Sequence, residues 1–540
     1  MSNTESRSHP PVTGAASGSP GASRLRRLAY KVSVFGGATA IVTFPVSVSL
    51  SQGGLALALL GWLLWALQRP KADAGGLAES PGNDDGGLAG DASSERLPFV
   101  RHPALLFAAL IYGVELVALL INGFESNDFL AFVGRGYRTE VKDVFLVGMA
   151  FWTAAYAHSP ENRKRLERLF LIALGIMIIA GLISIFSIYR LQKLPYHLTH
   201  GWEPGPNARY QHHVGSLFGG SENPLHLYMP IGLMNTHLTY GGILMMLFPV
   251  LVFRSLSLLL GPVKSVAPGA AGESDTVDDG DPGAQNDGAG PAALLRALRN
   301  VRPAQWIWPL ALAAASLIFI LNNGRSAIFG MLLATGFGFY VLARTGWRRR
   351  VLRLLPLILL AVASLVVLDR VSAGVHSRFE QIVGALFGRE KHTDFQRTLV
   401  WQGALQLSGE NPVFGVGPGN FEPSIIQNVV EYGQDQPHLW VAYELAQRGH
   451  AHNDMLHFLT IAGLPALLCY LAFFYFYVRH ILRPSGADPN FWKWGPVAIL
   501  GAGLFQCYFQ DDEVLLPFWA LVGFAISSGG VATSPSADRA

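Results

Sequence analysis

The chain has 540 residues, of which half are apolar and only 14% are charged, whereas about 25% are charged in a soluble globular domain. This composition excludes an ordinary soluble protein and is typical of a polytopic membrane protein. The formal net charge of +3 is small and gives no reason to expect a nucleic-acid partner.

Apolar runs of roughly 17 to 25 residues recur along the chain, each long enough to cross about 30 Å of hydrocarbon as a helix. Backbone groups in lipid must be hydrogen-bonded internally, and the runs lack the alternation of strands, so we predict an all-α fold with about 12 transmembrane helices. The expected spans are residues 29–48, 52–67, 104–121, 139–157, 168–188, 238–259, 305–321, 326–343, 351–368, 455–478, 495–510 and 514–528.

Lysine and arginine concentrate in the segments that this count places on one side of the membrane. Short cytoplasmic loops retain positive charge, so both termini are expected in the cytoplasm. The first basic and apolar stretch is expected to remain as an uncleaved anchor. Cys469 and Cys507 both fall in apolar spans, so neither a disulfide framework nor a cysteine metal site is expected.

The predicted organisation alternates helical blocks with polar segments. Three expected cytoplasmic segments, 1–23, 72–95 and 262–291, are rich in Gly, Ser, Pro, Ala and Asp. They are therefore expected to be disordered. The predicted parts are a disordered N-terminus at 1–23, spans one to nine at 24–368 with a non-cytoplasmic segment at 189–237 and the loop at 262–291, a large non-cytoplasmic loop at 369–454, the last three spans at 455–528, and a cytoplasmic tail at 529–540.

Three segments on the non-cytoplasmic side hold the informative sequence. Within the loop at 369–454, "DFQRTLVWQGALQLSGENP" has an apolar face at helical spacing and predicts a helix, and "VFGVGPGNF" after it predicts a Gly- and Pro-rich turn. Residues 129–145 alternate apolar and cationic side chains, which predicts an interfacial helix. The third segment is 189–237.

Arg325 stands in "LNNGRSAIFG", between two predicted spans and close to the outer membrane surface. An arginine in this position can simply extend to lipid phosphates. The small neighbours Gly324, Ser326 and Ala327 favour a different role, because they let other groups approach the guanidinium closely. A guanidinium matches phosphate oxygens in bidentate geometry, so Arg325 is a candidate phosphate ligand.

Arg135, Arg138 and Lys142 recur at spacings of three and four and would lie along one face of a helix. Such a stripe is either a solvated or headgroup-binding face or a site for an anionic ligand. Positive charge is normally kept out of short non-cytoplasmic segments, so its retention here favours an anion-binding role.

Histidines gather at the start of the predicted span 455–478. A histidine that stays neutral near the lipid boundary can accept a proton from a sugar hydroxyl, although it can also be a helix-start residue bonded to backbone. A zinc site is disfavoured because the chain has no HExxH, HxxEH or cysteine pair, and no metal or cofactor is expected. The residues concerned are His438, His450, His452 and His457, with Asn453 and Asp454 beside them.

The stretches "NNGRSAIFG", "ENPVFGVGPGNF" and "HNDMLHFLTIAGLPALL" together resemble the signature stretches of the O-antigen ligase and polymerase superfamily, and "NTHLTYGGIL" resembles its upstream partner. The resemblance covers roughly residues 205–470. It implies a membrane-embedded glycosyltransferase similar to the GT-C type, which takes a glycan from undecaprenyl diphosphate at the periplasmic face of the inner membrane. The acceptor would be the lipid A-core in a ligase, another repeat unit in a polymerase, or a protein serine.

The resemblance also implies roles for single residues. Arg325 would bind the diphosphate, and His452 would be the base, supported by His450, Asn453 and Asp454. The run before "NTHLTYGG" has no arginine where relatives often have one, with Met229 nearby, so the second phosphate ligand stays open. The expected donor-binding set is Arg135, Arg138, Lys142, Arg209 and His237.

Several functions remain compatible with these motifs. The size of the loop at 369–454 favours a ligase over a polymerase, because it suits a bulky lipid acceptor. A transporter or flippase for a lipid-linked glycan would need ionisable residues in mid-membrane, where Glu115 is the clearest example. A structural scaffold of the envelope would need no arginine and histidine set at all.

Overall fold

The computed structural model describes residues 20–68, 102–201, 209, 213–217, 225–260, 303–342, 392–427, 449–482 and 490–527. These residues are mostly helical, as predicted, but they also form a two-stranded antiparallel hairpin inside the segment 189–237. The predicted span 351–368, the segments 72–95 and 262–291, and the tail 529–540 lie outside the described residues.

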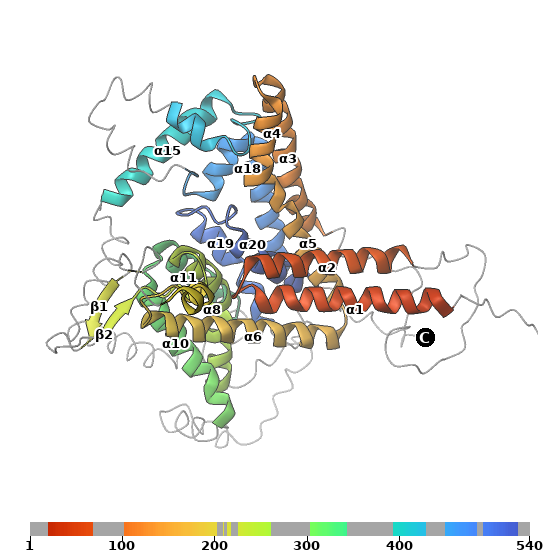
Figure 1. Cartoon of the computed structure of the whole chain (residues 1–540), viewed down its shortest axis with the longest axis vertical. Coiled ribbons are helices and arrows are strands. Elements are labelled where there is room, and N and C mark those ends of the chain that lie inside the picture. The colour runs from red at the N-terminus through yellow and green to blue at the C-terminus, as the bar shows by residue number, and fades with distance from the viewer. Residues whose placement is uncertain are drawn as a thin grey trace, which may run out of the picture.

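Long and short helices alternate with loops along the chain (Figure 1). The hairpin strands are β1 (His213–Leu217) and β2 (Leu225–Tyr228). The principal helices are α1 (Pro20–Thr43), α2 (Val48–Leu67), α3 (Pro103–Glu125), α4 (Phe129–Thr139), α5 (Val144–Tyr156), α6 (Pro160–Ile185), α7 (Leu194–His200), α8 (His237–Leu260), α10 (Ile307–Asn322), α11 (Arg325–Leu342), α15 (His392–Glu410), α18 (Asp454–Ile481), α19 (Val497–Ala502) and α20 (Asp512–Ser527).

Six of the described helices are long and apolar enough to cross a membrane, namely α2, α3, α6, α8, α11 and α18. Helix α10 is apolar but shorter. The chain is therefore a multi-pass membrane protein, but the predicted count of twelve spans is not reproduced in the described part. The predicted span 139–157 is divided, since α4 ends at Thr139 and α5 has only 13 residues.

The predicted span 495–510 is wrong, because the chain there forms no continuous helix. A 3-10 turn (Phe491–Trp494) and the six-residue helix α19 are followed by an irregular stretch at 503–511. Pro496 limits helix continuation, and the backbone finds partners elsewhere: the Gly503 carbonyl accepts the Asp454 N–H at 2.7 Å. The apolar composition of the segment reflects burial in the protein instead of contact with lipid.

Small residues bring the first two helices close together. Helices α1 and α2 lie side by side (Figure 1), and a Cβ added at Gly36 would come within 2.6 Å of the Gly54 carbonyl oxygen. A Cβ at Gly61 would come within 2.5 Å of the Ser33 nitrogen. Such glycines allow van der Waals contact between backbones, which stabilises helix pairs in a membrane.

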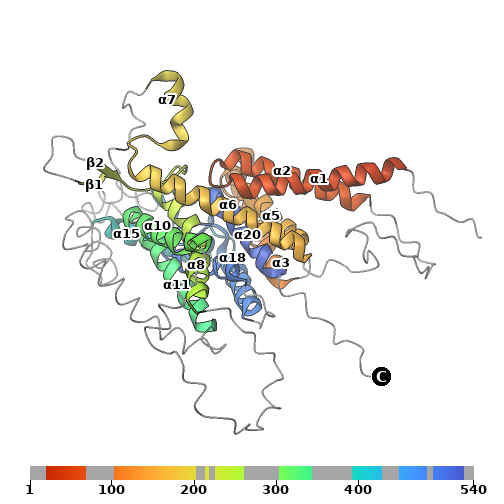
Figure 2. The same ribbon diagram turned by 90° about the horizontal axis from the view of Figure 1, so that it is seen from below.

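Several other helices also pack against one another in pairs. Helix α3 packs along α18, α5 packs along α20, and α8 packs against both α10 and α11. Figure 2 shows α8, α10 and α11 side by side, with α7 standing apart from them. His102 before α3 and His480 near the end of α18 are joined by a ring-nitrogen contact of 3.0 Å, so these two helices run antiparallel.

Helix α18 is kinked near its first third. Gly463 has φ 75° and ψ −172°, and Pro465 follows two residues later. Pro465 has no N–H to offer the Ile461 carbonyl, and the Leu464 N–H bonds to a preceding loop instead of to the Thr460 carbonyl. Two carbonyls of α18 are thereby left without helical partners.

The loop at 411–420, which is the predicted "VFGVGPGNF" turn, satisfies both carbonyls. The Val416 N–H donates to the Thr460 carbonyl at 2.9 Å, and the Gly417 N–H donates to the Ile461 carbonyl at 3.0 Å. Gly417 has φ +86°, a conformation that favours glycine. The turn ends α15 as predicted and holds that helix against α18.

Candidate active site

The irregular stretch 503–511 lies against the start of α18. The Asn453 amide donates to the Leu504 carbonyl at 3.1 Å, and the Phe509 N–H donates to Asp454 Oδ1 at 3.0 Å. Asp454 is completely buried. The supporting residues predicted beside His452 are thus attached to a segment that the sequence analysis had placed in a membrane helix.

His452 lies at the turn that precedes α18. Its Nδ1 is 3.3 Å from Gln506 Oε1, and its side chain is buried. The residue has φ +50°, in the left-handed region where residues other than glycine are uncommon. Asn453 caps the helix by accepting the Leu456 N–H at 2.9 Å, so the helix fixes the chain directly after the histidine.

His450 packs on His452, with ring centroids 4.3 Å apart and planes inclined at 55°. Burial lowers the pKa of His450 well below its usual value, and His452, His457 and Arg397 lower it further. Trp401 of α15 donates to the Ala451 carbonyl at 2.8 Å and thereby secures the loop between the two histidines. His450 is therefore neutral at neutral pH.

Arg325 is the first residue of α11 and is half-buried. The turn before it places Asn323 in the left-handed conformation, with φ 60°. The next residue, Ser326, shares a 3.0 Å hydrogen bond with the Tyr508 hydroxyl, and both residues are buried. This bond attaches the start of α11 to the stretch 503–511.

The two residues predicted to do chemistry are held by the same short piece of chain. Gln506 contacts His452, and Tyr508 contacts Ser326, the neighbour of Arg325. Residues two positions apart have Cα atoms no more than about 7 Å from one another. The structure therefore brings the turn of His452 and the start of α11 together at one place.

His237, the first residue of α8, belongs to the same region. The Asn322 amide donates to the His237 carbonyl at 2.9 Å, which joins the start of α8 to the end of α10. Two residues further, the Thr239 hydroxyl donates to Asp511 Oδ2 at 2.6 Å. Burial raises the pKa of Asp511 to about 6, although the hydrogen bond from Thr239 lowers it.

The cationic stripe is only partly as predicted. Arg135 and Arg138 lie on α4 and are exposed, and Arg135 Nη1 donates to Asn420 Oδ1 at 3.2 Å. Lys142 does not continue this face, because α4 ends at Thr139 and Lys142 lies in a separate 3-10 turn (Val141–Asp143). The helical spacing of four residues between Arg138 and Lys142 was therefore misleading.

Glu140 ends α4 and links three other parts of the region. Its Oε1 accepts the Gly419 N–H at 3.1 Å and the Gln510 amide at 3.0 Å, and its Oε2 lies 3.5 Å from His457 Nε2. Both Glu140 and His457 are buried. The turn at 411–420, α18 and the stretch 503–511 therefore meet at one carboxylate.

Arg209 was expected to bind the donor, but its guanidinium is engaged by backbone carbonyls of the protein. It is buried, and its guanidinium donates to the Ser184 carbonyl at 2.8 Å, to the Ser187 carbonyl at 3.1 Å and to the Met229 carbonyl. Burial, and secondarily Arg190, lowers the pKa of Arg209 to about 10, so it stays a cation. It ties the base of the hairpin to the end of α6, so its guanidinium is engaged within the protein.

Sequence reasoning missed the polar residues that assemble the site, above all Gln506, Tyr508, Gln510 and Glu140. Three of them stand in "FQCYFQDDE", where amide and acidic residues separate two apolar runs. This break in the apolar sequence could have indicated a polar segment. Among the residues that the structure describes, no group of three or more His, Cys, Asp and Glu side chains is arranged to hold a metal ion.

These helices and the buried polar cluster at their ends define a multi-pass membrane protein with a candidate active site beside its apolar spans. Residues 310–471 match the profile of the O-antigen ligase family. The chain therefore carries a domain of the O-antigen ligase family, and the resemblance seen in the sequence is confirmed. No curated protein matches the chain. The matched region includes Arg325, α15 and His452, whereas the stretch 503–511 lies beyond it.

Proposed function

We propose that the protein is an O-antigen ligase, a GT-C-like enzyme of the bacterial inner membrane that transfers a glycan from undecaprenyl diphosphate to the lipid A-core at the periplasmic face. The observation that carries this proposal is the attachment of both the His452 turn and the start of α11 to residues 506–508. A base and a cation held together in this way suit transfer from a sugar diphosphate.

In the proposed reaction the acceptor hydroxyl oxygen attacks the anomeric carbon of the donor sugar with inversion. The C–O bond to the diphosphate breaks, and undecaprenyl diphosphate leaves with the electron pair. Arg325 would neutralise the charge that develops on the departing diphosphate, an effect of preorganised electrostatics. The exposed Arg135 and Arg138 would bind the other phosphate oxygens as the donor approaches.

His452 would take the proton of the acceptor hydroxyl. If Nδ1–H donates to Gln506 Oε1, the lone pair falls on Nε2, which can accept this proton. His450 is neutral and packs against His452 with its ring tilted, so it adds no positive charge that would oppose the transfer. Positioned acid-base catalysis of this kind typically contributes about 10² to 10⁴-fold.

The discriminating experiment uses the purified full chain, an undecaprenyl diphosphate glycan and rough lipopolysaccharide. Lipopolysaccharide of higher mass supports a ligase. A longer lipid-linked glycan would instead identify a polymerase, and the absence of any new glycosidic bond would contradict both. We expect transfer to persist in excess chelator, and inactivation by the chelator would contradict the metal-free mechanism.

A further inference from the structure

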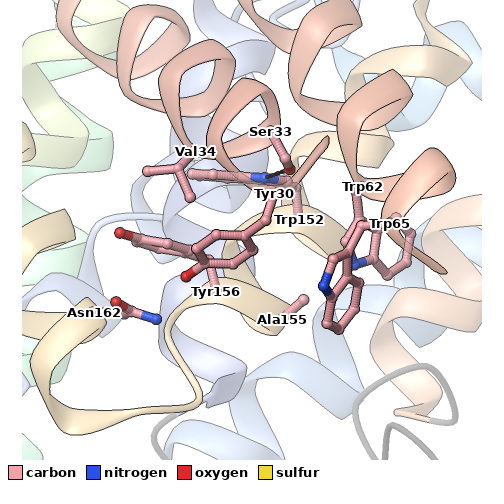
Figure 3. A pocket seen from close by; sticks show the side chains of 9 residues that line it. All are labelled: Tyr30, Ser33, Val34, Trp62, Trp65, Trp152, Ala155, Tyr156 and Asn162. Carbon is pink, nitrogen blue, oxygen red and sulfur yellow. Dashed lines mark hydrogen bonds between the residues drawn. The ribbon is translucent and has the colours of Figure 1, made fainter. Parts of the chain in front are cut away.

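A cavity of about 100 Å³ lies between α1, α2, α5 and the start of α6, and Figure 3 shows the side chains that line it. It is separate from the candidate active site, because the first eight residues of α5, or about 12 Å of helix, lie between the end that follows Glu140 and the first lining residue, Trp152. Most of the lining surface is aromatic. The rings belong to Tyr30, Trp62, Trp65, Trp152 and Tyr156.

The polar groups of the cavity are concentrated on one side. Tyr30, Tyr156 and Asn162 lie close together, whereas Trp62 and Trp65 stand across from them (Figure 3). The one hydroxyl on the inner wall, that of Ser33, is already engaged: it accepts the Trp152 indole N–H at 2.9 Å and donates to a carbonyl of α2. The cavity is therefore amphipathic, with an apolar wall and a polar edge.

Two guanidinium groups stand beside the cavity. The Arg26 guanidinium carbon lies 5.3 Å from the centroid of the Trp65 ring, and Arg165 follows the lining residue Asn162 by three positions in α6, so the two share one side of that helix. Among the described residues neither arginine forms an ion pair, and Glu161, one turn before Arg165, is exposed and does not approach it within ion-pair distance. Among the residues that the structure describes, the positive charge at this edge is thus not balanced by an ion pair.

We propose that this cavity binds a glycerophospholipid of net negative charge, with its phosphate between Arg26 and Arg165 and its glycerol and first acyl carbons among the aromatic rings. Guanidinium groups bind phosphate oxygens through charge-assisted hydrogen bonds. Tyrosine and tryptophan suit the border between headgroups and hydrocarbon, because each has a large apolar ring and one polar atom. The site is separate from the proposed glycosyl transfer.

The test is native mass spectrometry of the full chain in detergent, titrated with phosphatidylglycerol. The wild type should show a saturable first binding event. Ala155→Leu, which fills the cavity and keeps both arginines, should lose it, and Arg26→Gln with Arg165→Gln should weaken it at least about tenfold. Ala109→Leu, on an exposed face of α3, is the matched control and should bind as the wild type does.

Thermal unfolding of each variant in the same detergent establishes that it is folded. Binding of phosphatidylglycerol to folded Ala155→Leu with wild-type affinity would overturn the proposal, and so would unchanged binding to the double arginine variant. A third arm adds glycerol 3-phosphate in place of the lipid. Saturable binding of this soluble compound with equal affinity would show a phosphate site that does not use the aromatic wall, and would also overturn the proposal.

Discussion

His452, the proposed base, is held in a fixed position by the residues around it. It has a positive φ, it is buried, and its Nδ1 faces Gln506 Oε1 at 3.3 Å. A strained backbone at a buried titratable residue is a frequent feature of functional sites, because the surrounding structure must hold it in place. Here the capping amide of Asn453 and the glutamine do so from two sides.

Gln506→Leu should lower transfer activity without abolishing it. The substitution removes the acceptor for Nδ1–H, so the imidazole loses its fixed tautomer but keeps its basic nitrogen. We expect kcat to fall about 10 to 100-fold, less than the loss from His452→Ala, with KM for the donor nearly unchanged. A steady-state assay checks this, and an equal loss of kcat in both variants would show that Gln506 does more than orient the ring.

His450 should make the stability of the protein depend on pH. Its pKa is lowered in the folded state, so the folded protein resists protonation that the unfolded chain accepts near pH 6.5. The stabilising contribution is present above that pH and is lost as the pH falls below it. Thermal unfolding at pH 7.5 and 5.5 should show a smaller pH difference in His450→Gln than in the wild type. The exposed His213→Gln is the control, and identical pH differences in all three proteins would contradict the assignment.

The loop at 411–420 and the kinked helix α18 form one structural element, although they lie far apart in the order of the chain. The kink leaves the carbonyls of Thr460 and Ile461 without helical donors. Backbone N–H groups of the loop donate to these two carbonyls instead. The sequence analysis recognised both stretches by resemblance. Their mutual hydrogen bonding could not be predicted, because it depends on a three-dimensional contact between them.

Gly417→Ala should destabilise the protein. A side chain at φ +86° is strained, and its Cβ would lie 2.8 Å from the Phe132 ring, so a cost of roughly 1–3 kcal/mol is expected. The matched control is Gly409→Ala in α15, where an added Cβ meets nothing within 4 Å. Thermal unfolding should show a lower midpoint for Gly417→Ala and an unchanged or higher one for Gly409→Ala; equal midpoints would refute the packing argument.

In the molecule as a whole, apolar runs predicted most helices correctly, but the run at 495–510 predicted a continuous helix that does not form. The spans at 104–121, 168–188, 238–259 and 455–478 correspond to α3, α6, α8 and α18, because these runs are long, uninterrupted and rich in residues that suit helices. The run at 495–510 failed, since burial against other helices selects the same apolar residues that lipid does. Composition alone does not separate these two environments.

The candidate site was predictable in its two principal residues and not in its scaffold. Arg325 and His452 stand in recognisable stretches, and these stretches meet in the structure. The connection between them passes through 503–511, whose amides and hydroxyls have no distinctive spacing. Lys142 was selected for its charge and spacing, and Arg209 as a cation that could replace a missing arginine; neither signal revealed that Arg209 is engaged by carbonyls and that Lys142 lies outside the helix α4.

The deciding measurement is single-turnover transfer by Arg325→Ala, His452→Ala and the double variant, each shown by thermal unfolding to be folded. If both residues act in one reaction step, each single variant should lose at least about 100-fold in rate, and the double variant should lose little more than the slower single one. Arg479→Ala, near the opposite end of α18, and His213→Ala should transfer as the wild type does. A wild-type rate in either single variant at the site would contradict a shared role for Arg325 and His452.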